Sequence, residues 1–145
     1  MVRDDPPGLQ VRPFRQSDLA VVRDLVRQLG YDIAEAQLTR RIAGVLEAAD
    51  HRFVVAELGG RVVGMLHVFK RPALEKPCEA VVQAIVIDAD ARGQGLGRAL
   101  MRLAEEWARA QGLSSIALHT RKAGAFYAGL GYDHVASSDL MRKTL

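Results

Sequence analysis

The sequence predicts an α/β protein, more narrowly an α+β arrangement in which helices cover a single mixed sheet. Three observations predict this fold class. The pair Gly59-Gly60 separates two β-rich runs, as in an antiparallel hairpin. An apolar run is followed by a glycine-containing turn, a helical stripe and another β-rich run, which predicts a parallel crossover. Two early segments carry the apolar spacing of amphipathic helices, which need a sheet face to bury against.

In the first half of the chain, apolar alternation predicts a short strand over residues 9–14. Ser17-Asp18 is expected to cap a helix that ends before Gly30, and the stripe Leu38, Ile42, Val45 and Ala49 predicts a second helix. The hairpin strands are expected at residues 51–58 and 61–70. The second half is expected to contain a loop at 71–78, strands at 80–87 and 116–120, helices at 95–110 and 123–130, and two closing strands at 132–136 and 139–143.

Length and composition indicate one soluble domain. The chain has 145 residues, 49% hydrophobic and 26% charged, which suffices for one ordinary core. We expect residues 1–8, which are charged and proline-rich, to be a flexible tail, and residues 9–145 to be the single domain. No segment has the length of a membrane span or the pattern of a secretory signal, so we expect a cytoplasmic protein without membrane contact.

Charge and metal-ligand content exclude several classes of function. The net charge is only +3 and basic residues are interspersed with acids, so nucleic-acid binding is not expected. The single cysteine, Cys78, excludes an internal disulfide framework and a thiolate-rich zinc site. Four histidines without metal-ligand spacing predict no metal site.

Chemistry is most strongly indicated where the strand at residues 80–87 meets the next helix. Gly93, Gly95 and Gly97 alternate at the start of that helix. A helix N-terminus has unpaired N–H groups and a positive dipole end, and glycine lets an anion approach the main chain closely. Gly97 is followed by Arg98-Ala99, without the Lys-Ser or Lys-Thr of a nucleoside triphosphate loop, and the spacing does not fit a dinucleotide fingerprint. A phosphate or pyrophosphate site of another kind is predicted.

Two motifs resemble the GNAT superfamily of N-acetyltransferases in its compact single-domain form. Arg92-x-x-Gly95-x-Gly97 looks like the acetyl-CoA signature of that family, and Phe126-Tyr127-x-x-Leu130-Gly131-Tyr132 looks like its second hallmark. The predicted order β-α-α-β-β-β-α-β-α-β-β is also the order that the family uses. The resemblance covers nearly the whole chain. It implies an enzyme that transfers an acetyl group from acetyl-CoA to a primary amine of a small molecule, by direct attack on the thioester.

The resemblance also implies where the cofactor would lie. The parallel strand pair would splay apart beside the pantetheine arm, and a backbone N–H near Ile87 would stabilise the developing oxyanion. The pyrophosphate would be held by main-chain N–H groups in the glycine turn, while Leu96 points inward. The expected cofactor-binding residues are Ile85, Val86, Ile87, Arg92, Gly93, Gln94, Gly95, Leu96, Gly97 and Arg98.

For proton transfer, Tyr127 matches the usual general acid of the family. Many relatives have a glutamate where this chain has Gln83, and an amide cannot accept a proton at neutral pH. We therefore expect an ordered water to act as the base, with Gln83 orienting that water or the substrate. Glu79, His67 and His119 are substrate-side alternatives.

Two other functions stay open at this point. Because the carboxylate is absent and the loop before Tyr127 is short, the chain could be a coenzyme A-binding regulatory module with little or no turnover. A basic nucleic-acid module is the remaining alternative, which would show salt-dependent binding to DNA or RNA. The resemblance also implies a homodimer that forms through the C-terminal strands.

Overall fold

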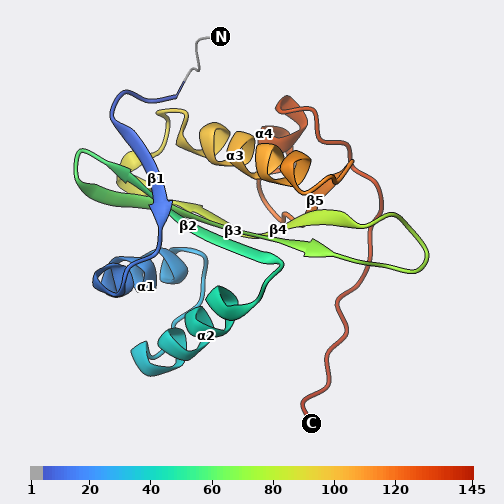
Figure 1. The fold of residues 1–145 in the computed structure, drawn as a ribbon, viewed down its shortest axis with the longest axis horizontal. Coiled ribbons are helices and arrows are strands. Elements are labelled where there is room, and N and C mark those ends of the chain that lie inside the picture. Colours follow the sequence, from blue (N-terminus) through green and yellow to red (C-terminus); the bar gives the residue numbers. More distant parts are fainter. Residues whose placement is uncertain (1–4) are drawn as a thin grey trace.

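The computed structural model describes residues 5–145, which form a five-stranded sheet with helices on both faces (Figure 1). The strands are β1 (Leu9–Pro13), β2 (His51–Leu58), β3 (Arg61–Arg71), β4 (Glu79–Ile87) and β5 (Ile116–Leu118), and they lie side by side in chain order. The helices are α1 (Leu19–Gln28), α2 (Glu35–Glu47), α3 (Leu96–Ala110) and α4 (Gly124–Gly129), with short 3-10 turns at Gln16–Asp18 and Ala89–Ala91. The first four strands are antiparallel, and β4 and β5 are parallel, joined by α3. The predicted mixed sheet is confirmed.

The hairpin between β2 and β3 forms where the two glycines predict it. Gly59 and Gly60 both have positive φ, at 60° and 78°, and Leu58 pairs with Arg61 across the turn. L-residues with a Cβ disfavour this backbone region, so the Gly-Gly pair determines the position of the turn.

Residues alternate between the two faces of the sheet, and each face has its own core. Helices α1 and α2 cover one face through buried residues such as Leu25 and Ile42, which pack with Val55 and Met65 of the sheet. Helix α3 covers the other face, where Leu100 and Met101 pack with partners that include Leu66 and Val82. In Figure 1 the two early helices lie below the sheet, and α3 and α4 lie above it.

Asp18 has a different role from the predicted one. Its carboxylate accepts two hydrogen bonds from the Arg12 guanidinium, at 2.8 and 3.0 Å, and one from the backbone N–H of Arg15. The Asp18 side chain therefore makes no capping hydrogen bond to the backbone of α1. Arg12 also donates to Glu57 of β2 at 2.7 Å, so this buried cluster ties β1 to β2 and to the start of α1.

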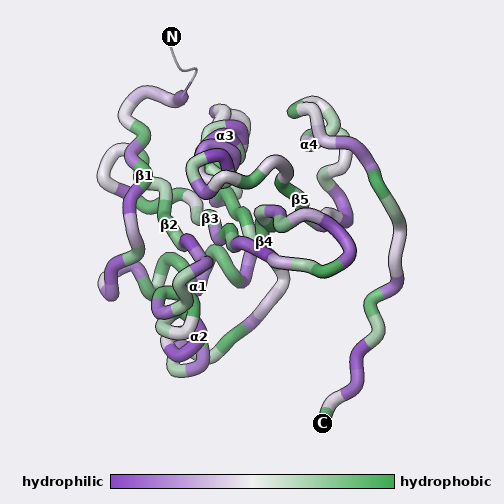
Figure 2. The backbone as a smooth tube through the Cα atoms, turned by 45° about the vertical axis from the view of Figure 1, so that its right-hand side comes forward, coloured by the Kyte–Doolittle hydropathy of each residue, from purple (hydrophilic) through white to green (hydrophobic). Residues whose placement is uncertain are grey.

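The two closing strands expected at residues 132–136 and 139–143 are a wrong prediction. After α4 the chain is extended and exposed without pairing in the sheet, and its apolar side chains Val135, Leu140 and Met141 are exposed. Figure 2 shows this segment running away from the body of the protein. The neighbouring edge strand, β5, is only three residues long, which is a poor template for further pairing. The homodimer expected through these strands is not shown.

At the other end, residues 1–4 of the predicted tail lie outside the described residues. The following residues contact the domain, because Asp5 accepts a hydrogen bond from Arg102 at 2.8 Å and Pro6 is buried.

Candidate active site

Strand β4 has two halves with different neighbours. Residues 80–82 pair with β3 on one side and with β5 on the other, the last parallel pair being Val82 with Leu118. From residue 83 onward β4 keeps its partner β3 but has no partner in β5. The edge of β4 beyond the end of β5 is therefore open from Gln83 onward, and this open edge is called the gap below.

Backbone groups of β4 point into this gap. The N–H of Asp88 bonds the carbonyl oxygen of Val63 in β3 at 2.8 Å. Backbone direction alternates along an antiparallel strand, so the N–H groups of Ile87 and Ile85 point to the opposite, unpaired edge. The Ile87 carbonyl, on the same edge, accepts a bond from Arg92 Nε at 3.2 Å. An extended, amide-bearing ligand could pair with this edge as a further strand would.

A β-bulge lies at the start of the gap. His67 of β3 pairs with Ala84 and Val68 pairs with Val82, so Gln83 is the extra residue and both Gln83 and Ala84 oppose His67. Gln83 is exposed, and it follows Val82 of the α3-side core, so alternation directs its side chain to the α1/α2 face.

The glycine turn follows β4 directly and leads into α3. Gly93 and Gly95 have φ of 80° and 83°, and an added Cβ on Gly93 would meet no atom within 4 Å, so open space lies in front of it. Among the described residues the backbone N–H groups of Gln94, Gly95, Gly97 and Arg98 have no hydrogen-bond acceptor. Such groups at a helix start form an anion site. Leu96 is buried against Val63 and Ala91, which anchors the helix start under the turn.

Helix α4 packs on this same turn. A Cβ on Gly97 would lie 3.2 Å from the Phe126 ring, so the missing side chain of Gly97 makes room for α4. Tyr127 is next to Phe126 with its ring edge-on at 5.0 Å, and it packs on the α3-side core that includes Ile85 and Ile87. Burial raises the pKa of Tyr127, so the phenol keeps its proton at neutral pH.

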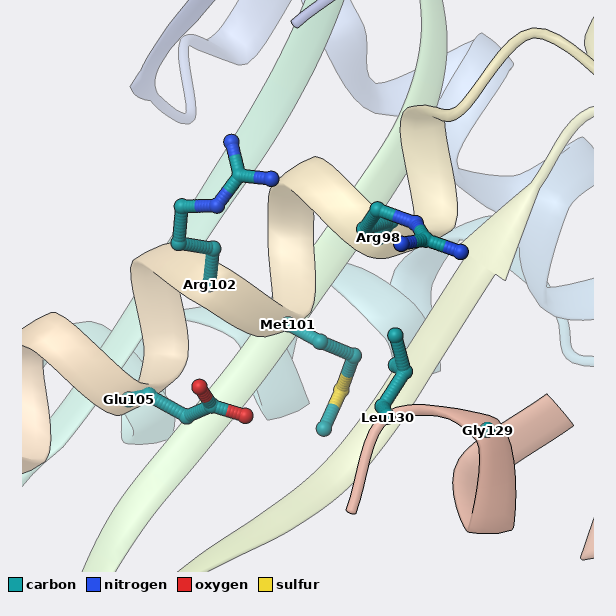
Figure 3. Close-up of a pocket in the computed structure, with 6 residues that line it drawn as sticks. All are labelled: Arg98, Met101, Arg102, Glu105, Gly129 and Leu130. Carbon is teal, nitrogen blue, oxygen red and sulfur yellow. The ribbon is translucent and has the colours of Figure 1, made fainter. Parts of the chain in front are cut away.

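A pocket of about 250 Å³ lies between α3 and α4 beside the glycine turn (Figure 3). Its lining residues are Arg98, Met101, Arg102, Glu105, Gly129 and Leu130. Met101 and Leu130 face each other across it, while the two arginines lie along the exposed side of α3. The pocket thus has an apolar side, the guanidinium of Arg98 and the carboxylate of Glu105, while the charge of Arg102 is paired with Asp5 at 2.8 Å. Arg102 was not predicted, although its spacing of four from Arg98 places both on one helix face.

The structure separates the three substrate-side candidates. Glu79 lies at the far end of β4, and its carboxylate holds Arg71 at 2.6 Å and Lys76 at 3.2 Å. Burial acts to raise the pKa of Glu79, but these two partners outweigh it and the net shift is downward. His119 is exposed and directly follows Leu118, the last residue of β5, which pairs with Val82. The register thus sets His67 opposite Gln83 and Ala84, whereas Glu79 lies at the other end of β4.

His51, which was not predicted, lies beside His67. Nδ1 of His51 and Nε2 of His67 are 2.8 Å apart, and the His51 ring stacks on Phe69 at 5.0 Å. Counting residues outward from the Gly59-Gly60 turn would have paired His51 with residue 68 instead of Phe69, because the hairpin contains a one-residue shift at Ala56/Glu57. The sequence would therefore have predicted the hairpin register to within one residue, but it could not have predicted the contact between the two histidine rings.

Within residues 5–145, no three His, Cys, Asp or Glu side chains gather as a metal site requires. No helix in this described part is long and apolar enough to cross a membrane.

Comparisons with known proteins agree on one family. The profile of the acetyltransferase (GNAT) family matches residues 19–132. Glucosamine 6-phosphate N-acetyltransferase from Trypanosoma brucei brucei is 28% identical, over 88% of this chain and 91% of that protein.

Solved structures show the same fold. The aminoglycoside 6'-N-acetyltransferase AAC(6')-Ih from Acinetobacter baumannii superposes with a TM-score of 0.81 at 18% identity, covering 95% of this chain and 99% of that one. AAC(6')-Iy in complex with CoA superposes with a TM-score of 0.81 at 16% identity, covering 94% and 95%.

Proposed function

The chain belongs to the GNAT family of acetyltransferases, which use acetyl-CoA, and from this we propose that it acetylates a primary amine of a small molecule. The family makes it an N-acetyltransferase. Its similarity to proteins named for glucosamine 6-phosphate and for aminoglycosides, both small molecules that carry amines, supports this acceptor class. The observation that supports it most is the unpaired edge of β4 next to the glycine turn.

The residues present fit acetyl-CoA. The N–H groups of Ile85 and Ile87 that point to the open edge suit its amide-bearing arm. Val86, between them, is buried in the core under α1 and α2. The free N–H groups of residues 94, 95, 97 and 98 suit the pyrophosphate, and the pocket with Arg98 suits the charged nucleotide end. Arg92 and Gly93 shape the turn, Arg92 by its bond to the Ile87 carbonyl. When bound, acetyl-CoA supplies the thioester carbonyl that an amine attacks and the thiolate that leaves.

Two groups serve the leaving side of the reaction. Tyr127 holds a proton on its phenol oxygen through the neutral pH range, because burial raises its pKa, and we assign it to protonate the leaving sulfur. The unpaired N–H of Ile87 is the donor for the oxyanion that forms during attack. Tyr127 packs on the α3 side, whereas the Ile87 N–H lies in the plane of the sheet at its open edge.

The acceptor amine then approaches from the α1/α2 face. Gln83 is exposed at the bulge on that side, and we assign it to orient the substrate or an ordered water through its amide. His67 lies opposite Gln83, and His119 directly follows the end of β5. The leaving-group chemistry is on the α3 side and the acceptor amine approaches from the α1/α2 side. The two meet at the open edge of β4.

Calorimetric titration with acetyl-CoA, alongside a coupled assay for free coenzyme A thiol, tests this function. The amine panel contains glucosamine 6-phosphate, an aminoglycoside, a polyamine, an aminophosphonate and a peptide N-terminus. We expect acetyl-CoA to bind and thiol to be released with at least one of the small amines.

Two other results would overturn the proposal. Release with the peptide alone would move the acceptor to a protein N-terminus, and binding without release for any amine would favour a regulatory module. Gly112→Ala is the matched binding control, because Gly112 has a φ of 76° like the turn glycines and lies at the far end of α3.

A further inference from the structure

We propose that His67 is the base that takes the proton from the acceptor amine, and that His51 is a positioning residue that holds His67 in the tautomer able to accept it. The inference rests on the proposed function and specifies the acceptor side of that site. It replaces the solvent-only route by a pair of side chains from β2 and β3.

The position of His67 carries the first part. Because of the bulge, Gln83 and Ala84 both oppose His67, and strand neighbours lie about 5 Å apart. The parallel partner of β4 ends one residue before Gln83, so His67 stands one strand away from the start of the gap. Its neighbours Met65 and Ala84 belong to the α1/α2-side core, so His67 is on the face from which the amine approaches.

The contact with His51 carries the second part. A distance of 2.8 Å between His51 Nδ1 and His67 Nε2 requires one proton between the two nitrogen atoms. When His67 carries that proton on Nε2 and donates it to His51, Nδ1 of His67 is left as a free acceptor. The stacking of His51 on Phe69 holds the His51 ring in place for this bond. The pair thus resembles other arrangements in which a second group determines the tautomer of a catalytic imidazole.

Few charges affect the pair. The pKa of His67 is lowered from 6.5 to about 4, by burial first and by His51 second, so the ring is neutral at physiological pH. Of the charged groups on the same face, Arg71 and Glu79 pair with each other at the far end of β3 and β4, with Lys76 on the same carboxylate. Asp50 precedes His51 and is exposed, while α1 and α2 present apolar side chains such as Leu25 and Ile42 to this core.

The proton balance is simple. As the amine nitrogen forms its bond to the acetyl carbon, its N–H bond breaks and the proton passes to His67 Nδ1. The imidazolium keeps its Nε2–H bond to His51, while burial and the nearby His51 ring disfavour its charge, so the ring gives up the proton readily. The proton then leaves to water, which restores the neutral pair, while Tyr127 supplies the separate proton for the leaving sulfur and takes one back from water.

The test compares variants in the acetylation of an amine accepted by the wild-type protein. We expect His67→Gln to lower kcat/KM at least 30-fold without changing the Kd for acetyl-CoA, and added imidazole to restore at least threefold activity to His67→Ala. His51→Asn, whose side-chain oxygen can accept the same bond, should stay within threefold, whereas His51→Leu should lose at least tenfold. His134→Gln, in the exposed C-terminal segment, is the control and should match the wild type.

These kinetics separate a base from a structural pair. A structural role would give no rescue by imidazole and no difference between His51→Asn and His51→Leu once both are folded. A His67→Gln variant within twofold of the wild type, with acetyl-CoA bound normally, would overturn the base and leave the proposed function intact. A larger loss in His119→Gln than in His67→Gln would move the base to the other side of the gap.

A nitrogen-15 NMR measurement on the histidine rings needs no turnover. We expect the His67 proton on Nε2 and a bare Nδ1 at pH 7. A proton on Nδ1 instead would overturn the inference. If no amine releases thiol, the proposed function fails. The NMR measurement then still tests the inference, because it shows whether Nδ1 of His67 is free to accept a proton.

Discussion

The two halves of β4 have nearly the same composition and different surroundings. Both are apolar and pair with β3, but residues 80–82 also pair with β5 and residues 83–87 do not. The first half is buried throughout, whereas the second contains exposed Gln83 and backbone groups that point into a gap. The difference shows that the site forms where the neighbouring strand ends, because backbone N–H and C=O groups without a strand partner can bind a ligand.

The strongest test of this comparison is Tyr127→Phe, on the α3 side of the open half. The ring remains and only the proton donor is lost, so we expect kcat to fall about 100-fold. Steady-state kinetics with a saturating amine would measure it. The Kd for acetyl-CoA should change less than threefold, and an unchanged kcat would remove Tyr127 from the chemistry.

Val81→Ala should affect stability alone, because Val81 lies in the half that is paired on both sides and is buried. Loss of two methyl groups in a packed core costs about 2 kcal/mol. Urea unfolding would show this loss, and kcat/KM at low temperature should stay within twofold. A large loss of activity in the folded variant would mean that the two halves are not functionally separate.

Gln83→Ala tests the bulge residue itself. Its exposed side chain contributes little to the core, so the urea midpoint should not move. We expect kcat/KM to fall about tenfold, because the group that orients the acceptor side is lost. A smaller loss would argue against this role for Gln83.

Gly93→Ala and Gly112→Ala form a matched pair at the two ends of α3. Both glycines have positive φ, at 80° and 76°, and an added Cβ meets nothing within 4 Å in either case. Each substitution should cost about 1 kcal/mol in the free energy of unfolding. Only Gly93→Ala should weaken acetyl-CoA binding in calorimetry, and equal affinities would contradict an anion site in the turn.

The smallest effect concerns pH and His67, opposite the bulge. Its pKa is lowered from 6.5 to about 4 in the folded protein, so between these values the unfolded chain binds more protons. The stability linked to His67 is therefore complete above about pH 6.5 and is lost as the pH falls toward 4. His67→Gln should show a slightly smaller drop in urea midpoint between pH 7 and pH 5 than the wild type, and an equal drop would contradict the shift.

The fold was largely available from local patterns. Gly59-Gly60 placed the first hairpin, the apolar stripe of the helix expected at 95–110 placed α3, and the glycines after β4 placed the turn. The closing strands failed because alternation at residues 132–143 says nothing about whether a neighbouring edge is long enough to pair with. Asp18 was misassigned for a similar reason, since its partner Arg12 comes from another strand.

By itself, the sequence determined the family, the mixed sheet and the glycine turn, because these depend on residue types at short spacings. Only the tertiary structure decided where β5 leaves β4, that Gly97 receives Phe126, and that His51 meets His67. Those contacts join residues that are 16 or more positions apart, and they depend on register shifts such as the bulge at Gln83. A shift of one residue turns side chains to the other face, so only the assembled sheet shows which groups share the site.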